Sequence, residues 1–209
     1  DNEWAAANLP SLRASPSKPL EVNSTLAGTT TRDRSYLIAL ALATLAVRAQ
    51  ERVALMGSPH RPGHARASLG PMATWLLQSE GAQLPPAQQL QKLSSAVLIS
   101  DFFDRPADIE VAVRTLAANG VSGHIVQIID PAEEALPYSG RVEFRDMDGP
   151  QKFLAGKTEN LRKIYVEKFH QQRDAVRKLA GSLKWSFTVH RTDQSPASLL
   201  MSLHGLIGG

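Results

Sequence analysis

The chain has 209 residues, 43% hydrophobic and 21% charged, with a formal net charge of +3 at pH 7 and no cysteine. This composition is typical of one globular domain, and the lack of cysteine excludes disulfides and thiolate metal sites. The longest apolar run, residues 36–47, is shorter than the roughly 20 residues of a membrane-spanning helix, and no signal peptide is visible, so we expect a cytoplasmic protein without a membrane span.

The first 30 residues predict little regular structure. Residues 3–7 look helical from their first position, so we expect the chain to lack an N-terminal segment of the full-length protein. Residues 10–19 contain three prolines, which argues against a central strand because proline cannot donate to a sheet ladder. Thr30 and Asp33 have the spacing of a capping box and predict the start of a helix.

The next 60 residues predict two helices and a strand. Residues 36–47 are apolar on nearly every side, which indicates a buried helix lying across a sheet. Residues 51–57 are predicted to form a strand, residues 58–64 a loop, and residues 67–79 a helix that Gly70 and Pro71 can restart. Residues 81–89 are polar and contain proline, so they are predicted to be a connector.

The most informative stretch is the apolar run at residues 96–99, which leads directly into Ser100 and Asp101. A short apolar run bounded by turn signals is typical of a strand buried on both faces. The carboxyl end of such a strand faces the crevice where open α/β sheets bind ligands. Asp101 is therefore the best single candidate for a site residue.

A regular alternation of helices and strands follows. A helix is predicted from Pro106 to a stop at residues 119–120, then a buried strand at 123–130, a capped turn at 130–133, and an edge strand or hairpin at 140–146. Residues 158–183 predict the longest helix and residues 185–190 a last strand, after which Ser195 caps a final helix. This order predicts a single α/β domain over residues 1–209, with a mostly parallel central sheet, interior strands at 97–100 and 125–129, and helices on both faces.

Several of these stretches together resemble a known family. They are residues 3–8, 51–55, 100–102, 130–133, 136–138, 140–144 and 190–193. The chain resembles the bacterial domain of unknown function number fifty-eight, a relative of the von Willebrand factor A domain. The resemblance implies a Rossmann-like, von Willebrand factor A-type fold and a metal-ion-dependent adhesion site, in which hydroxyl and carboxylate oxygens hold Mg²⁺ or Ca²⁺.

In this sequence the adhesion site implied by the resemblance is degenerate. Asp101 matches the late aspartate, and Ser15 and Ser17 match the two serines of the early loop, but Arg13 stands where the first aspartate belongs. A fixed positive charge there disfavours a divalent cation, so we expect either no cofactor or weakly bound Mg²⁺ or Ca²⁺. Residues 21–25 offer a competing match that keeps an acid but has no apolar strand before it.

Two functions follow from these observations. The resemblance implies a non-catalytic protein-interaction module, because relatives are commonly encoded beside a MoxR-type AAA+ ATPase or other von Willebrand factor A-like proteins. The alternative is a divalent-metal-dependent hydrolase or phosphotransferase using Asp101 with Asp130 or Asp146. We favour the first, since no nucleotide-binding loop, nucleophile elbow or nucleophile–base pair can be named.

Two other groups of side chains have simpler interpretations. His60 and His64 have a ligand-like spacing, but Pro62 and Gly63 between them prevent a helix from placing both rings on one face, so zinc is not expected. The basic residues of the long helix at 158–183 lack interleaved aromatic residues, which favours a solvated face, so we do not expect nucleic acid as a partner.

Overall fold

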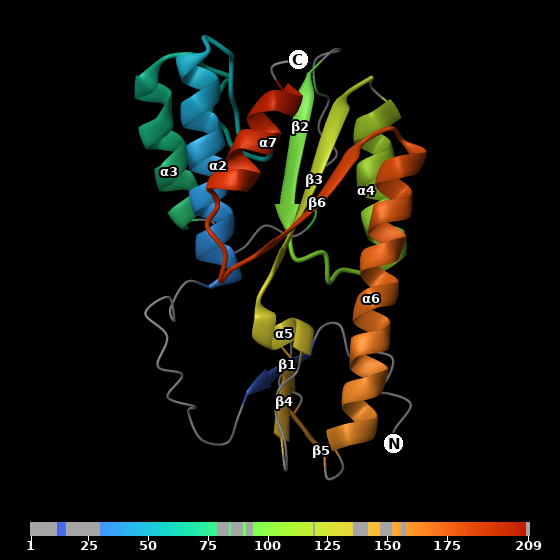
Figure 1. Ribbon diagram of the computed structural model, residues 1–209. Coiled ribbons are helices and arrows are strands. Elements are labelled where there is room, and N and C mark those ends of the chain that lie inside the picture. Colours follow the sequence, from blue (N-terminus) through green and yellow to red (C-terminus); the bar gives the residue numbers. More distant parts are fainter. Residues whose placement is uncertain are drawn as a thin grey trace.

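The computed structural model of the protein describes residues 12–15, 30–78, 84, 90, 94–118, 120–135, 142–146, 152–155 and 158–207. Its centre is a three-stranded parallel sheet in the order β2-β3-β6 (Figure 1). The strands are β2 (Ser95–Ser100), β3 (Ser122–Ile129) and β6 (Ser186–Arg191). The predicted mixed α/β architecture with a parallel sheet is confirmed.

The central strand of this sheet is β3, which pairs in parallel with β2 on one side and β6 on the other. Every residue of β3 after Ser122 is buried, as its apolar sequence predicts. The prediction of an interior position is wrong for β2, which has one neighbour in the described sheet. Alternate residues of β2 pack on opposite faces of the sheet. Its apolar run is therefore explained by helices that cover both faces, and not by strands on both sides.

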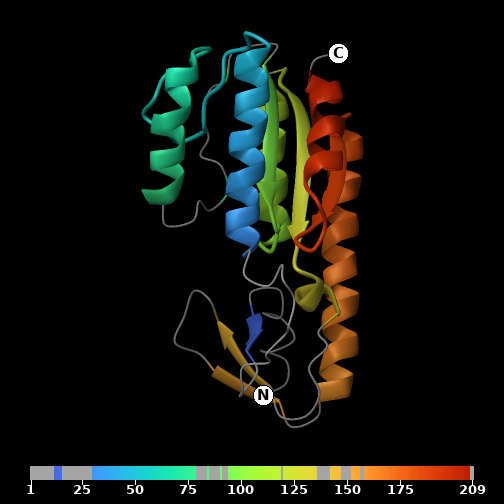
Figure 2. The same cartoon turned by 60° about the vertical axis from the view of Figure 1, so that its left-hand side comes forward.

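Helices cover both faces of the parallel sheet (Figures 1 and 2). On one face, α2 (Thr31–Arg48) and α7 (Ala197–Ile207) form a core with the sheet. On the other face, α4 (Pro106–Ala118) and α6 (Thr158–Ser182) pack on the sheet around Trp185 and Ile125. These two layers confirm the predicted helical cover, and within the described residues no helix is long and apolar enough to cross a membrane.

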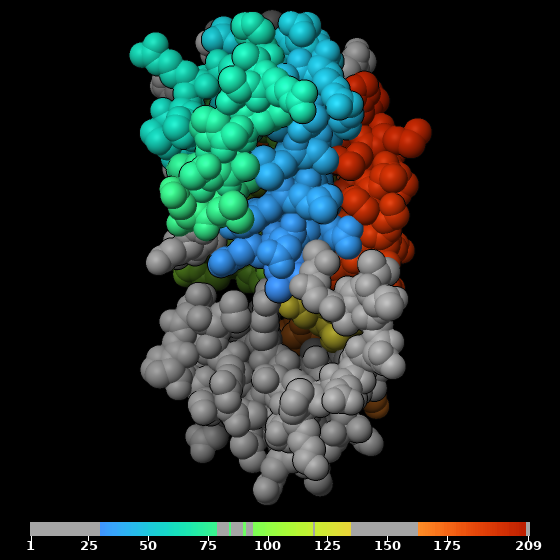
Figure 3. All heavy atoms as spheres, turned by 90° about the vertical axis from the view of Figure 1, so that its left-hand side faces the viewer, coloured from blue at the N-terminus to red at the C-terminus, as the bar shows by residue number. Residues whose placement is uncertain are grey.

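The predicted core helix is present, but it is less buried than its sequence indicates. The capping box of Thr30 and Asp33 is confirmed, since each side chain accepts from the backbone N–H of the other. Figure 3 shows α2 at the molecular surface between α3 (Leu69–Gln78) and α7. Leu37 is 47% exposed, so the helix is covered by its two neighbours and the sheet rather than enclosed.

The strand predicted at residues 51–57 is wrong. This segment contributes only an isolated antiparallel bridge between Val53 and Gly63, which closes the loop that follows. The apolar residues of this segment have no neighbouring strand with which to pair in the described sheets. Gly57 also has a left-handed backbone, with φ of 78°, which ends the extended conformation. A short 3₁₀ turn, η2 (Arg66–Ser68), then leads into α3, which agrees with the predicted helix.

A second, antiparallel sheet has the order β1-β4-β5 and lies beyond the carboxyl ends of the parallel strands (Figures 1 and 2). Its strands are β1 (Leu12–Ser15), β4 (Val142–Asp146) and β5 (Lys152–Ala155). The predicted hairpin is thus confirmed, but β4 is the central strand of this sheet and not an edge strand. The short helix α5 (Pro131–Ala135) follows β3 on the same side.

Candidate functional site at the carboxyl edge of the parallel sheet

The loop after β2 turns sharply at the carboxyl edge of the sheet. The Ser100 hydroxyl accepts from the backbone N–H of Phe102 at 3.2 Å, and Oδ1 of Asp101 accepts from the N–H of Phe103 at 3.3 Å. The Ser100 hydroxyl also lies 3.4 Å from this carboxylate oxygen. The half-buried Asp101 carboxylate is therefore held at the end of β2, where the sequence predicts it.

Two buried glutamines fix the carbonyl groups of this loop. Gln127 on β3, only 1% exposed, donates from Nε2 to the carbonyl of Asp101 at 2.9 Å. Gln172 on α6 donates to the carbonyls of Phe102 and Asp104 at 3.0 and 2.8 Å. A buried carbonyl without a partner is costly, so these amides determine where the loop can lie.

Phe102 occupies the left-handed region of backbone space, with φ of 56°, and its side chain is 2% exposed. A bulky residue adopts this conformation only where its surroundings over-determine it, and such positions are concentrated at functional sites. Here Gln172 and the apolar core around the Phe102 ring supply the constraint. The loop is therefore rigid and preorganised.

The neighbouring strand, β3, ends at Asp130, which begins α5. Oδ1 of Asp130 accepts from the backbone N–H of Ala132 at 2.7 Å, and the Asp130 carbonyl accepts from the N–H groups of Glu133 and Glu134. The predicted capped turn is confirmed. Because one carboxylate oxygen is used in the cap, Asp130 acts first as a structural residue.

On the α2 face, the edge holds a buried cation. Arg34, 6% exposed, donates from Nη2 to the carbonyl of Thr192 at 2.7 Å. His190 on β6 is 3% exposed, and its pKa is lowered by burial and then by the nearby Arg34 charge, against an opposing effect of Asp193. In the described part of the chain, Nε of Arg34 and Nε2 of His190 have no hydrogen-bond partner.

Ion pairs join β6 to α5 and α6 at the same edge. Glu134 accepts from Arg173 at 2.6 Å and lies 3.6 Å from Arg191, which in turn pairs with Asp193 at 3.0 Å. The Asp193 carboxylate raises the pKa of Arg191. Arg173 also lies over the Phe169 ring, with its guanidinium carbon 4.8 Å from the ring centroid. The edge thus presents alternating charges that are already paired with each other.

Two of the three predicted metal ligands, Ser15 and Asp101, lie at the ends of strands that the structure describes. Ser15 is the last residue of β1 in the antiparallel sheet, paired in register with Glu143, while Asp101 follows β2 in the parallel sheet. Ser17 lies outside the described residues, and so do residues 21–25 of the competing match. Asp101 is the one predicted ligand whose side chain is described, and no three acidic or histidine side chains in the described ranges are grouped to hold a cation.

Of the acids in the hydrolase alternative, Asp130 lies at the same edge as Asp101, since β2 and β3 are adjacent parallel strands, whereas Asp146 lies in the other sheet. Asp130 caps α5, and Asp146 ends β4 in the other sheet, in register with Leu12. His60 and His64 are both exposed and lie near the opposite end of α2.

The structure adds functional candidates that the sequence reasoning missed: Gln127, Gln172 and Arg34. Gln127 lies within an otherwise buried apolar strand, and a polar residue there is the one signal that could have identified it. The other two depend on contacts across 70 and 158 residues, for which no local pattern exists.

The comparisons with known proteins show one match. A family model described as "Protein of unknown function DUF58" matches residues 21–175, more than half of the chain. No curated protein and no solved structure matches. The matched range includes the carboxyl ends of β2 and β3 and the start of α6. The chain belongs to the DUF58 family.

Proposed function

We propose that this protein is a non-catalytic interaction module that binds its partner with the carboxyl edge of the parallel sheet. The observation that carries the proposal is the meeting of three stretches that are distant in the sequence: residues 100–102, 130–133 and 190–193. All three carry the resemblance to the family, and they follow β2, β3 and β6 at one edge. Hydrogen bonds tie two of these stretches to β3: the Thr192 N–H donates to the Ile129 carbonyl at 2.9 Å, and Gln127 donates to the Asp101 carbonyl at 2.9 Å.

Charge and rigidity support a protein partner. Half-buried Asp101, half-buried Arg191 and exposed Asp193 present both signs of charge at the edge. Charges held in fixed positions give specificity and speed to association when the partner presents the complementary pattern. The preorganised Ser100–Asp104 loop lowers the entropy lost on binding.

We further propose that the sheet is of the von Willebrand factor A type, that its adhesion site is degenerate, and that the partner is a MoxR-type AAA+ ATPase. The resemblance in the three edge stretches supports the fold type. Arg13 in place of the first acid supports the loss of tight cation binding, and the same resemblance favours the ATPase as partner.

The test is calorimetric titration of the purified full-length protein with a MoxR-type AAA+ ATPase from the same organism. The charge reversals Asp101→Lys and Arg191→Glu are each expected to weaken binding about tenfold, as for charge pairs at an interface. The matched controls are Glu110→Lys and Arg114→Glu, an exposed ion pair on the outer face of α4. Equal losses in the controls and the edge variants would place the contact elsewhere.

The same preparation tests the hydrolase alternative. The protein is expected to hydrolyse neither nucleotides nor phosphate esters above background in Mg²⁺ or Mn²⁺. Turnover that Asp101→Asn abolishes would overturn the proposal in favour of an enzyme.

A further inference from the structure

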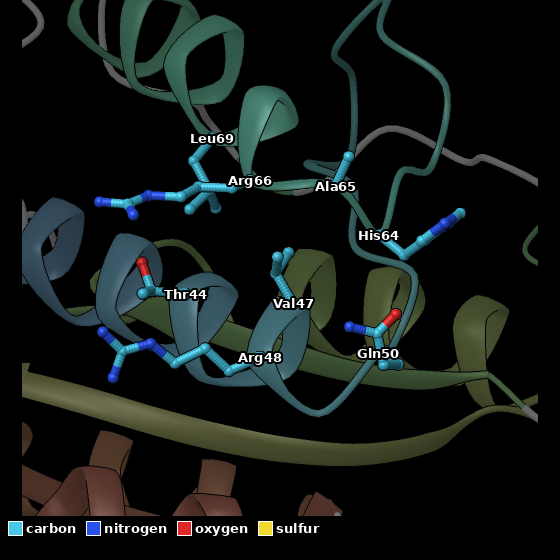
Figure 4. A pocket seen from close by; sticks show the side chains of 8 residues that line it. All are labelled: Thr44, Val47, Arg48, Gln50, His64, Ala65, Arg66 and Leu69. Carbon is cyan, nitrogen blue, oxygen red and sulfur yellow. The ribbon is translucent and has the colours of Figure 1, made fainter.

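A pocket lies away from the carboxyl edge. A pocket of about 420 Å³ opens between the C-terminal end of α2 and the start of α3 (Figure 4). Arg34 in the first turn of α2 contacts the carboxyl edge, and Arg48 in the pocket lies 14 residues further along the same helix. At 1.5 Å per residue the two sites are about 20 Å apart. The pocket is within the size range of sites for small organic molecules.

Two arginines mark one end of the pocket. Figure 4 shows the guanidinium groups of Arg48, from α2, and Arg66, from η2, at the same end, on either side of Thr44. In the part of the chain that the structure describes, neither guanidinium has a hydrogen bond or an ion pair. Two unpaired guanidinium groups at one end of a pocket are suited to an oxyanion, which each can bind through two N–H groups.

The pocket lies in a basic region of the chain. Residues 41–78 contain four arginines, one glutamate and no lysine or aspartate, a formal charge of +3 that equals the net charge of the whole protein. A concentration of one sign of charge around a cleft raises the local concentration of ligands with the opposite sign. The surroundings of the pocket therefore favour an anion.

The adjacent helix end does not oppose an anion strongly. The carbonyls of Ala46 and Val47, in the last turn of α2, accept from the N–H groups of Glu51 and Gln50 at 2.9 and 3.1 Å. The partial negative charge at a helix C-terminus comes from carbonyls without partners. Since these two have partners, the arginines dominate the local charge.

The remainder of the lining determines the shape of the ligand. Val47, Ala65 and Leu69 form an apolar wall, while Gln50 and His64 lie at the end opposite the arginines (Figure 4). We propose that this pocket binds a small organic anion, whose carboxylate or phosphate lies between Arg48 and Arg66 and whose apolar body covers Val47 and Leu69. This site is independent of the partner surface at the carboxyl edge.

The proposal is tested by titrating the full-length protein with four probes: phenyl phosphate, benzoate, inorganic phosphate and phenol. At least one of the two organic anions is expected to bind with 1:1 stoichiometry and more tightly than inorganic phosphate and phenol. Comparing phenyl phosphate with benzoate identifies which oxyanion is preferred. Saturation by none of the probes at millimolar concentration, or equal binding of phenol, would overturn the proposal.

A pair of variants separates a specific site from general attraction. Arg48→Gln/Arg66→Gln is expected to weaken binding of the preferred probe about tenfold, because both charge-assisted contacts are lost. The control Arg32→Gln/Lys184→Gln removes the same charge from exposed positions outside the pocket and is expected to change affinity less than twofold. Equal losses in both variants would mean non-specific attraction and would overturn the proposal.

Discussion

Single residues determine how closely the layers of this protein pack, and Gly123 on β3 is the clearest case. The indole ring of Trp185 lies where a Cβ at this position would stand, and its Nε1 donates to the carbonyl of Val121 at 3.2 Å. Trp185 can therefore pack in the core between the sheet and α6 only because residue 123 has no side chain.

We predict that Gly123→Ala destabilises the protein by about 2–3 kcal/mol, since the added methyl group must displace a buried ring. Urea denaturation measures the change. The control is Gly181→Ala in the last turn of α6, where nothing lies within 4 Å of the added atom; it is expected to be neutral or to stabilise by up to about 1 kcal/mol. A Gly123→Ala midpoint equal to that of the wild type would contradict this packing.

The protonation of buried His190 is expected to make the free energy of unfolding depend on pH. Burial lowers its pKa in the folded protein below the ordinary value of about 6.5. As the pH falls, His190 therefore takes up a proton in the unfolded chain before it does so in the folded chain. The stability that neutral His190 contributes is fully present above about pH 6.5, and it is lost as the pH falls toward the pKa of His190 in the folded protein.

The measurement compares the free energy of unfolding of the wild type and His190→Gln between pH 7.5 and 5. The stability of the wild type is expected to fall more steeply than that of the variant, while His60→Gln, at an exposed position, should follow the wild type. Parallel curves for the wild type and His190→Gln would show that His190 does not titrate in this way.

Site residues could be predicted from the sequence only where a local pattern marks them. Asp101 stands at the end of an apolar run and Asp130 before Pro131, and the structure places both at the carboxyl edge. Gln172 lies on the long helix α6, and nothing nearby in the sequence shows that it contacts a loop 70 residues earlier. The adhesion-site assignment of Ser15 and Ser17 stays a prediction.

At the scale of elements, the Ser100–Asp104 loop depends on α6 as well as on its own sequence. Gln172→Leu leaves the carbonyls of Phe102 and Asp104 without their donor, which costs about 1–3 kcal/mol. The loop should then leave its left-handed turn and exchange its amide hydrogens faster. The control Gln171→Leu removes an exposed glutamine of the same helix and should leave the loop unchanged.

Three helices end at a residue with a left-handed backbone, and they give a matched set of predictions. Gln50 after α2 and Lys184 after α6 have φ of 64° and 59°, where glycine is usual, and α4 ends at Gly120 with φ of 72°. We expect Gln50→Gly and Lys184→Gly each to raise the free energy of unfolding by up to about 1 kcal/mol, and Gly120→Ala to lower it by a similar amount. Thermal denaturation provides the test; the same sign for all three changes would contradict it.

Elements were predictable where their patterns were strong. The predicted boundaries of β3, α6 and β6 agree with the structure to within one or two residues. The strand expected at 51–57 is absent from the described sheets, because apolar content alone cannot show whether a strand has a neighbour to pair with. For the same reason the edge position of β2 was not predictable.

At the scale of the whole molecule, the alternation of strands and helices was sufficient to predict a parallel sheet between two helical layers. It did not predict the separate antiparallel sheet, because β1 and β4 are joined by contacts between residues 12–15 and 143–146, far apart in the chain. The structure thus has two distinct regions of interest, the polar carboxyl edge and the basic pocket at the other end of α2.

The central claim is that the carboxyl edge is the contact surface for a protein partner. Hydrogen–deuterium exchange of the full-length protein, with and without the proposed partner, a MoxR-type AAA+ ATPase, tests it most directly. We predict slower exchange on binding at residues 100–104, 130–134 and 190–193, and no change on the exposed face of α4 around Glu110 and Arg114. Complex formation with protection confined to α4, or to the pocket around Arg48 and Arg66, would contradict the claim.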